Sequence, residues 1–148
     1  MGDVGTGKTH MLEALCALCC QSMRQARFLA ASSLVMRPGR ARDGGSLDRE
    51  LAQLARAELL GIDELGFLPL DVDGARLLFQ VVSESYERQS LVITTNLGSG
   101  RWGTVFGDDQ MAAAVIDRVC HHGRLLRLGG ESYRVRHAPV SGEVGVDG

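Results

Sequence analysis

The first residues of the chain combine glycines, a lysine and a threonine at a spacing that could hold the phosphates of a nucleotide. Residues 2–9 read Gly-x-x-x-x-Gly-Lys-Thr and precede a helical pattern. Glycine lets the backbone take positive φ and come close to a phosphate, and exposed N–H groups at a helix start attract anions. The candidate binding residues are Gly2, Asp3, Val4, Gly5, Thr6, Gly7, Lys8, Thr9 and His10.

This spacing is that of the phosphate-binding loop (P-loop) of many nucleoside triphosphatases. In such a loop, Lys8 would reach the β- and γ-phosphates as a point charge, and the Thr9 hydroxyl would be a ligand of Mg²⁺. Lys8 is the single lysine among the 16 lysine and arginine residues, and it stands at the one position where this chemistry requires a lysine. The alternative interpretation is a glycine-rich turn that binds nothing.

Two carboxylates and an amide follow apolar runs further along the chain. Asp63 comes directly after Leu59–Ile62, where a carboxylate is costly unless it has a charged partner, and Mg²⁺ on the phosphates would be that partner. Glu64 could orient or deprotonate the attacking water, and Asn96 could hold that water from the other side. The alternatives are an exposed acidic turn and an ordinary turn asparagine.

Arg118 is the remaining candidate for catalysis, on a predicted helix at residues 110–121. One interpretation is a surface arginine in a local ion pair, which adds little stability. The other is an arginine finger that reaches the γ-phosphate on a neighbouring subunit and stabilises the transition state. The residues alone leave both interpretations open.

Short apolar runs and helical patterns alternate along the chain, which is typical of a parallel sheet covered by helices on both faces. In such α/β sheets ligands bind at the carboxyl ends of the strands, where the loop, Asp63, Glu64 and Asn96 would all lie. Helices are predicted at residues 8–25, 46–57 and 110–121 and around 77–86, and strands at 27–32, 59–62 and 91–95.

The remaining segments have weaker patterns. Residues 101–109 are predicted to be irregular, with Trp102 and Phe106 packed into the core; the alternative is that these two aromatic residues contact a partner. Residues 125–128 and 132–136 are predicted to be two strands joined by a Gly-Gly turn. The basic segment 37–45 is either a solvated loop or a contact to nucleic-acid backbone, and the tail 137–148 is predicted to be disordered. The four cysteines are Cys16, Cys19, Cys20 and Cys120, which we interpret as helix-packing residues rather than zinc ligands.

Composition sets limits on the class of protein. A chain of 148 residues with 45% hydrophobic and 23% charged residues is an ordinary globular domain. Its formal net charge is −2, which excludes binding to nucleic acid through an overall positive charge. No run has membrane-spanning length and the N-terminus lacks a signal pattern, so we expect a cytoplasmic protein with no membrane contact.

Several segments together resemble one family. The sequence is similar to the IstB-like ATPases, which are helper proteins of insertion-sequence transposition akin to the DnaC helicase loaders. The Asp-Glu-Leu-Gly-Phe-Leu-Pro-Leu run at 63–70 and the Trp-Gly-x-x-Phe-Gly-Asp run at 102–108 are the most specific matches. The resemblance extends over residues 2–10, 59–70, 77–88, 94–96, 101–108, 116–122 and 130–134.

The resemblance implies an AAA+ domain over residues 1–136 that binds ATP and Mg²⁺. It also implies ATP hydrolysis, homo-oligomerisation on duplex DNA and delivery of a partner transposase to target DNA. The roles that it implies are Walker A for Lys8 and Thr9, Walker B for Asp63 and Glu64, sensor 1 for Asn96, and the finger for Arg118.

The sequence departs from the family pattern at its start. Family members have an N-terminal helical domain and a strand that leads into the P-loop, whereas Met1 here stands where that strand should end. We therefore expect the first strand to be missing and the domain to be truncated, which would expose strand edges at 91–95 and 124–128. The alternative functions are a DnaC-like replicative helicase loader and a non-catalytic truncated remnant.

Overall fold

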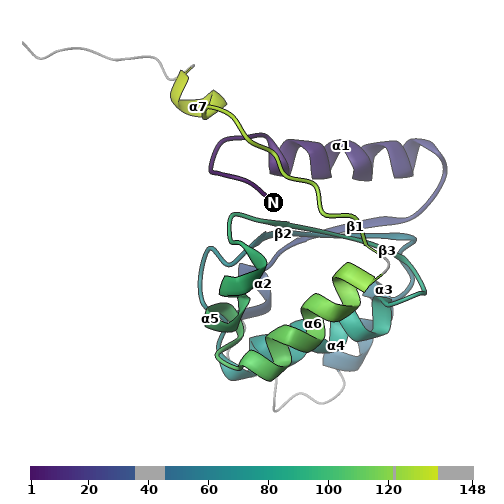
Figure 1. Ribbon diagram of the computed structural model, residues 1–148. Helices are drawn as coiled ribbons and strands as arrows, with labels where there is room; N and C mark the ends of the chain where they lie inside the picture. Colours follow the sequence, from purple (N-terminus) through teal and green to yellow (C-terminus); the bar gives the residue numbers. More distant parts are fainter. Residues whose placement is uncertain (36–45, 122, 137–148) are drawn as a thin grey trace, which may run out of the picture.

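A parallel β-sheet separates the helices into two layers (Figure 1). In this computed structural model the described residues are 1–35, 46–121 and 123–136. Within them the sheet has the order β1-β2-β3, with β1 at Ala26–Ala30, β2 at Leu59–Leu65 and β3 at Ser90–Thr95. Both strand pairs are parallel, which confirms the predicted α/β class.

One face of the sheet is covered by α1 and the other by most of the remaining helices (Figure 1). Helix α1 ends at Gln21 rather than near residue 25, because Met23 adopts a left-handed φ of 60° that cannot continue a helix. The other helices are α2 (Ser32–Val35), α3 (Ser46–Leu54), α4 (Val72–Ser85), the 3₁₀ turn η1 (Ser99–Arg101), α5 (Trp102–Phe106), α6 (Asp109–His121) and α7 (Tyr133–Arg136).

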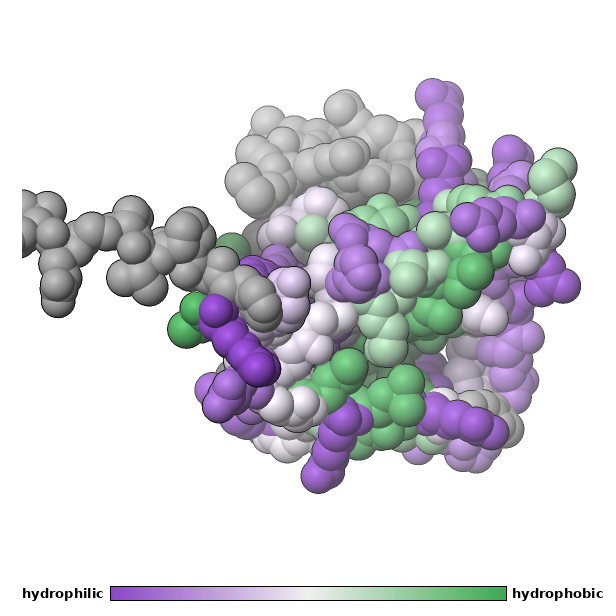
Figure 2. All heavy atoms as spheres, turned by 90° about the horizontal axis from the view of Figure 1, so that it is seen from above, coloured by the Kyte–Doolittle hydropathy of each residue, from purple (hydrophilic) through white to green (hydrophobic). Residues whose placement is uncertain are grey.

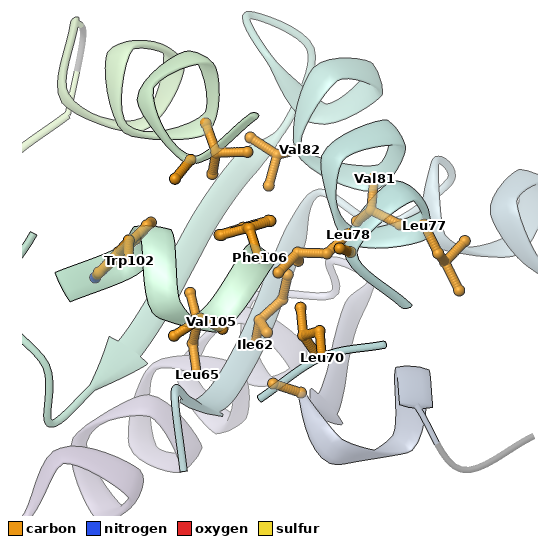
Figure 3. Close-up of a cluster of buried hydrophobic side chains, with 14 of the residues drawn as sticks. Ile62, Leu65, Leu70, Leu77, Leu78, Val81, Val82, Trp102, Val105 and Phe106 are labelled. Carbon is orange, nitrogen blue, oxygen red and sulfur yellow. The ribbon is translucent and has the colours of Figure 1, made fainter. Parts of the chain in front are cut away.

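The main core lies between the sheet and the layer that contains α4, α5 and α6 (Figure 3). Ile62 and Leu65 of β2 meet Leu78 and Val82 of α4 in this core. Because fully burying one such aliphatic side chain contributes about 1.5–3 kcal/mol, this cluster fixes β2 and therefore the position of the residues that follow it.

The segment predicted to be irregular, 101–109, contains a short helix instead. Helix α5 ends at Phe106, and the Gly107 that caps it has a φ of 64°, the left-handed conformation typical of a helix C-terminus. The prediction that its aromatic residues pack into the core is confirmed, since Trp102 and Phe106 are only 6% and 4% exposed. A pattern this short carries too few turns for helical periodicity to be visible in the sequence.

Helix α4 is capped at its N-terminus by Asp71. The Asp71 Oδ1 accepts a hydrogen bond from the Gly74 backbone N–H at 2.7 Å, whereas Asp73 makes only an exposed ion pair with Arg76 at 3.8 Å. We expect Asp71→Ala to lower the free energy of unfolding by about 1 kcal/mol, the usual cost of losing a helix cap. Chemical denaturation would measure it, with Asp73→Ala as the matched control. Equal losses in the two variants would contradict this assignment.

Helix α1 packs on the sheet through Leu12, which is fully buried. A Cβ built on Gly61 of β2 would lie 2.8 Å from Leu12 Cδ1, so glycine at that position allows the close approach. Leu15, Leu18 and Phe28 are among the exposed apolar residues. Seen from above, the molecule shows apolar residues (green) at its surface among hydrophilic ones (Figure 2). Burial, followed by the neighbouring Cys19, Cys20 and Glu13, raises the pKa of the Cys16 thiol, which favours its protonated, less reactive form.

The first two residues lie between β3 and the stretch that precedes Leu128. The Gly2 N–H donates to the Thr95 carbonyl at 3.1 Å, and the Leu128 N–H donates to the Met1 carbonyl at 2.8 Å. Gly2 and Leu128 also form an isolated parallel bridge. Met1 and Gly2 therefore connect β3 to residues 126–128, which belong to the segment predicted as a strand at 124–128.

The prediction of a β-hairpin at residues 125–136 is wrong. Apart from the bridge at Leu128, residues 125–128 are not assigned to a strand, and residues 133–136 form the short helix α7. The backbone groups that the hairpin would have paired are used elsewhere, because Leu128 bonds to Met1 and the Tyr133 N–H donates to the Gly5 carbonyl at 3.0 Å. Contacts to the distant loop therefore replace the local pairing.

Two predictions fall outside the described residues, namely those for the basic segment 37–45 and for the tail 137–148. Across the part of the chain that is described, no helix has the length and apolar character needed to cross a membrane.

Candidate nucleotide-binding site

A cavity of about 900 Å³ opens at the carboxyl ends of the strands, where the P-loop precedes α1. Three parts of the chain form its walls: the loop with the first turns of α1, the ends of β2 and β3, and a stretch that follows Leu128. The lining residues are Val4, Gly5, Thr6, Gly7, Lys8, Thr9, His10, Glu13, Glu64, Phe67, Thr94, Asn96, Gly129, Glu131, Tyr133 and Arg134.

The backbone of the loop has the geometry that an anion site needs. Gly5 and Gly7 adopt φ values of 80° and 83°, which side-chain-bearing residues take only with strain. Gly7 is also the N-cap of α1, and no side chain caps that helix end. The first N–H groups of α1 are therefore left to a ligand or to water, and the helix dipole favours a negative one.

Lys8 is held over this loop by backbone carbonyls. Its ammonium donates hydrogen bonds to the Gly2 carbonyl at 2.7 Å and to the Asp3 carbonyl at 2.5 Å. The Thr6 hydroxyl donates to the same Asp3 carbonyl at 2.8 Å, which tightens the turn. Burial, and then the charge of Lys8, lower the pKa of the Met1 amino group. Lys8 thus places a positive charge at the centre of the loop.

Asp63 lies beneath the cavity rather than in its wall. Its carboxylate is 4% exposed and accepts a short hydrogen bond from the Thr94 hydroxyl of β3. The Thr94 oxygen in turn accepts the Glu64 N–H at 3.0 Å. Thr94 lines the cavity and so connects the buried carboxylate to it.

Glu64 has an unusual backbone conformation. Its φ of 59° lies in the left-handed region, and the pairing of β2 with β3 shifts register between Ile62 and Leu65. A non-glycine residue in this region costs on the order of 1–3 kcal/mol, and such strain is concentrated at functional sites. The kink leaves Glu64 exposed in the cavity wall although its neighbours Asp63 and Leu65 are buried.

The cavity brings together most of the residues singled out from the sequence. Lys8, Thr9, Glu64 and Asn96 line it, with Asp63 behind Thr94. Gly2 and Asp3 contribute carbonyls to Lys8 without lining the cavity.

Arg118 lies elsewhere, on α6. Its guanidinium donates to the Ala114 carbonyl at 3.0 Å and lies 5.1 Å from the centre of the Phe79 ring, a cation–π distance. A role for Arg118 at a phosphate would therefore concern the cavity of another copy of the chain, and the finger stays a prediction.

The sequence reasoning missed Thr94 and the wall formed by residues 129–134. Thr94 is the first threonine of an ordinary β-branched strand, so nothing in its type marked it as a link between Asp63 and Glu64. Residues 130–134 did belong to a segment that supported the family resemblance. The local sequence pattern predicts a hairpin for these residues, and a hairpin would give them no role at the site.

Comparison with known proteins identifies what this chain is similar to. The family model described as "IstB-like ATP binding protein" matches residues 1–141. The "Insertion sequence IS21 putative ATP-binding protein" of Pseudomonas aeruginosa is 35% identical over 142 residues, which are 96% of this chain and 54% of that protein. The chain thus spans about half the length of the curated relatives it matches.

Solved structures share the fold at low sequence identity. The replication initiator DnaA bound to AMPPCP and single-stranded DNA superposes with a TM-score of 0.72 at 18% identity, over 88% of this chain and 39% of that chain. The DnaC helicase loader superposes with a TM-score of 0.66 at 21% identity, over 88% and 75% of the two chains. This chain therefore shares its fold with these proteins, which agrees with the predicted AAA+ P-loop fold class.

Proposed function

The chain belongs to the family of IstB-like ATP-binding proteins, and we propose that it binds and hydrolyses ATP with Mg²⁺ as a helper protein of DNA transposition. The observation that carries this proposal is that Lys8, Thr9, Glu64 and Asn96 line a single cavity at the carboxyl edge of the sheet. Each of these residues carries a group that phosphoryl transfer to water requires.

The triphosphate would be held by the loop and by Lys8. The left-handed Gly5 and Gly7 and the uncapped start of α1 offer backbone N–H groups to it. The Lys8 ammonium would exchange its bonds to the Gly2 and Asp3 carbonyls for stronger bonds to charged phosphate oxygens.

The residues present fit Mg²⁺. The described residues contain no cluster of three or more His, Cys, Asp or Glu that could hold a metal without a nucleotide. Mg²⁺ at a nucleotide takes only one or two protein oxygens and completes its shell with phosphates and water, so two protein ligands are enough. The Thr9 hydroxyl and the Asp63 carboxylate, the latter directly or through water, would hold it. Bound there, Mg²⁺ would neutralise charge that develops on the β- and γ-phosphates.

Glu64 and Asn96 would act on the attacking water. Glu64 is exposed and lines the cavity, where its carboxylate would orient the water and accept its proton. Asn96 at the end of β3 would hold the water or the γ-phosphate through its amide. In an oligomer, Arg118 would be supplied to a neighbouring copy, for which its side chain would have to leave Phe79.

Duplex DNA and a transposase are the partners that we propose for the protein. The support is that the Pseudomonas aeruginosa relative is named as a protein of an insertion sequence. A replicative helicase loader is the second candidate, favoured by the similarity to DnaC, although at 21% identity that similarity concerns the fold. A transposase reading frame beside the gene would favour the first function, and adjacent replication genes the second.

A titration of the purified chain with ATP tests the core of this proposal. With Mg²⁺ present and ATP at about 100 times its Kd, binding should raise the free energy of unfolding by about 2.7 kcal/mol. Calorimetric titration would give the Kd, and phosphate release would report hydrolysis. Absence of any ATP-dependent stabilisation at millimolar ATP would contradict the proposal.

A further inference from the structure

Two residues of β2 lie opposite one residue of β3 at the place where the two acids of the site follow each other. The regular pairs on either side are Ile62 with Ile93 and Leu65 with Thr95. Between these pairs, Asp63 and Glu64 together lie opposite Thr94. Two residues opposite one is the arrangement of a β-bulge, which redirects side chains and is frequent beside active sites. Thr94 is therefore a cross-strand neighbour that both acids share.

The Thr94 side chain contacts both acids at this bulge. Its hydroxyl donates a hydrogen bond to Oδ1 of Asp63 and accepts one from the Glu64 backbone N–H at 3.0 Å. A hydroxyl has one proton, so this donor is committed to Asp63. Thr94 is 5% exposed, and water therefore has little access to replace it. The bonds form a chain from the Glu64 N–H through the hydroxyl to the carboxylate, in which each bond strengthens the next.

These two bonds restrain the parts of the acids on which hydrolysis would depend. Fixing one carboxylate oxygen of Asp63 also fixes the direction of the other, which a cation could use. The bond to the Glu64 N–H forms where that residue has its left-handed φ of 59°, a conformation that persists only when its surroundings hold it. One hydroxyl thus restrains both the carboxylate proposed for Mg²⁺ and the backbone of the proposed base.

We propose that Thr94 is a positioning residue for ATP hydrolysis, whose single hydroxyl orients Asp63 for Mg²⁺ and holds Glu64 in its kinked conformation. This inference rests on the proposed function and adds to it a residue that acts through the two acids. Partners that orient metal-binding carboxylates typically contribute about 10- to 100-fold in metal affinity or activity. A loss of that size is the expected effect of removing the hydroxyl.

Thr95, the next residue of β3, provides a matched control. It is 4% exposed, and its hydroxyl also makes two hydrogen bonds, to the Leu65 carbonyl at 2.7 Å and from the Leu97 N–H at 3.0 Å. Neither of these bonds involves a carboxylate. Thr94→Val and Thr95→Val therefore remove the same group at a similar depth, but only the first removes it from the two acids.

The test measures ATP binding by the full chain in calorimetric titrations with Mg²⁺ and with EDTA, and phosphate release in parallel. Mg²⁺ should tighten ATP binding by the wild type. In Thr94→Val this gain should be about 10- to 100-fold smaller and hydrolysis slower by a similar factor, whereas ATP binding in EDTA should be unchanged. Thr94→Ser keeps the hydroxyl and should recover most of both losses. Thr95→Val should keep the wild-type gain from Mg²⁺.

A second comparison covers the case in which Thr94→Val does not fold, because that substitution leaves a buried carboxylate without its donor. Asp63→Asn removes the charge, so this variant can be compared with the double variant that also carries Thr94→Val. The added substitution should cause no further loss of ATP binding in Mg²⁺. A further loss of about tenfold would show that Thr94 acts without Asp63 and would overturn the inference.

The remaining outcomes separate this inference from the proposed function. If the wild type binds ATP and Thr94→Val gains as much from Mg²⁺, the inference is wrong and the proposed function stands. The same conclusion follows if Thr95→Val loses as much of the gain as Thr94→Val, or if Thr94→Ser recovers none of it. If the wild type binds no ATP, or gains nothing from Mg²⁺, the proposed function fails together with the inference.

Discussion

Replacing Lys8 with alanine is expected to weaken ATP binding by about 100-fold. One hydrogen bond between charged groups contributes about 1.5–3 kcal/mol, or roughly 10- to 150-fold in Kd. Lys8 lies at the centre of the loop and would contact two phosphates. ADP should lose less than ATP and AMP least, because the charge of Lys8 acts on the β- and γ-phosphates. Calorimetric titration with the three nucleotides measures this order.

The fold should be little changed by the same substitution. The Lys8 ammonium bonds to two backbone carbonyls, and the loop lies at an open cavity where water can replace it. The control is Arg76→Ala, since Arg76 is an exposed cation on α4 whose ion pair with Asp73 is weak. Tight ATP binding by Lys8→Ala, or an equal loss in Arg76→Ala, would show that the loop does not hold the phosphates.

The parts of the fold that the sequence predicts are those set by local patterns. The P-loop spacing, the β-branched run at 91–95 and the apolar run at 59–62 each specify a structure within a few residues. Because the carboxyl ends of parallel strands share one edge, these three segments also predict that Lys8, Glu64 and Asn96 come together. The cavity lining agrees with this arrangement.

The parts that the sequence does not predict depend on contacts between distant residues. Residues 125–136 have alternating apolar residues and a Gly-Gly pair, which locally favour a hairpin. Their backbone instead bonds to Met1 and Gly5, more than 100 residues earlier in the chain. Thr94 was missed for the same reason, because its role depends on the Asp63 carboxylate on the neighbouring strand.

At the kink in β2, the adjacent carboxylates of Asp63 and Glu64 lie in different environments. At the left-handed φ of Glu64 and the register shift, the pairing of β2 with β3 is interrupted. Asp63 is buried there against Thr94, whereas Glu64 is exposed in the cavity wall. Two adjacent carboxylates thereby have different environments, which is what separate roles at metal and water would require.

Replacing Glu64 with glutamine is accordingly expected to slow ATP hydrolysis by about 10²- to 10⁴-fold, the usual contribution of a general base. Glutamine keeps the size and the backbone N–H that bonds to Thr94, but it cannot accept a proton from water. ATP binding should therefore stay within about threefold of the wild type, because the contact that is lost forms mainly in the transition state. Single-turnover hydrolysis and calorimetric titration measure the two quantities separately.

The matched control for this substitution is Glu58→Gln, directly before the other end of β2. Glu58 is exposed and pairs with Arg24 at 3.6 Å, a surface contact that contributes little. Its hydrolysis rate should equal that of the wild type. If Glu64→Gln hydrolysed ATP at the wild-type rate, the water would be activated by another group, and the strained conformation at Glu64 would need a structural explanation. If it lost ATP binding and hydrolysis together, Glu64 would act on the bound ground state, and its assignment as the base would be wrong.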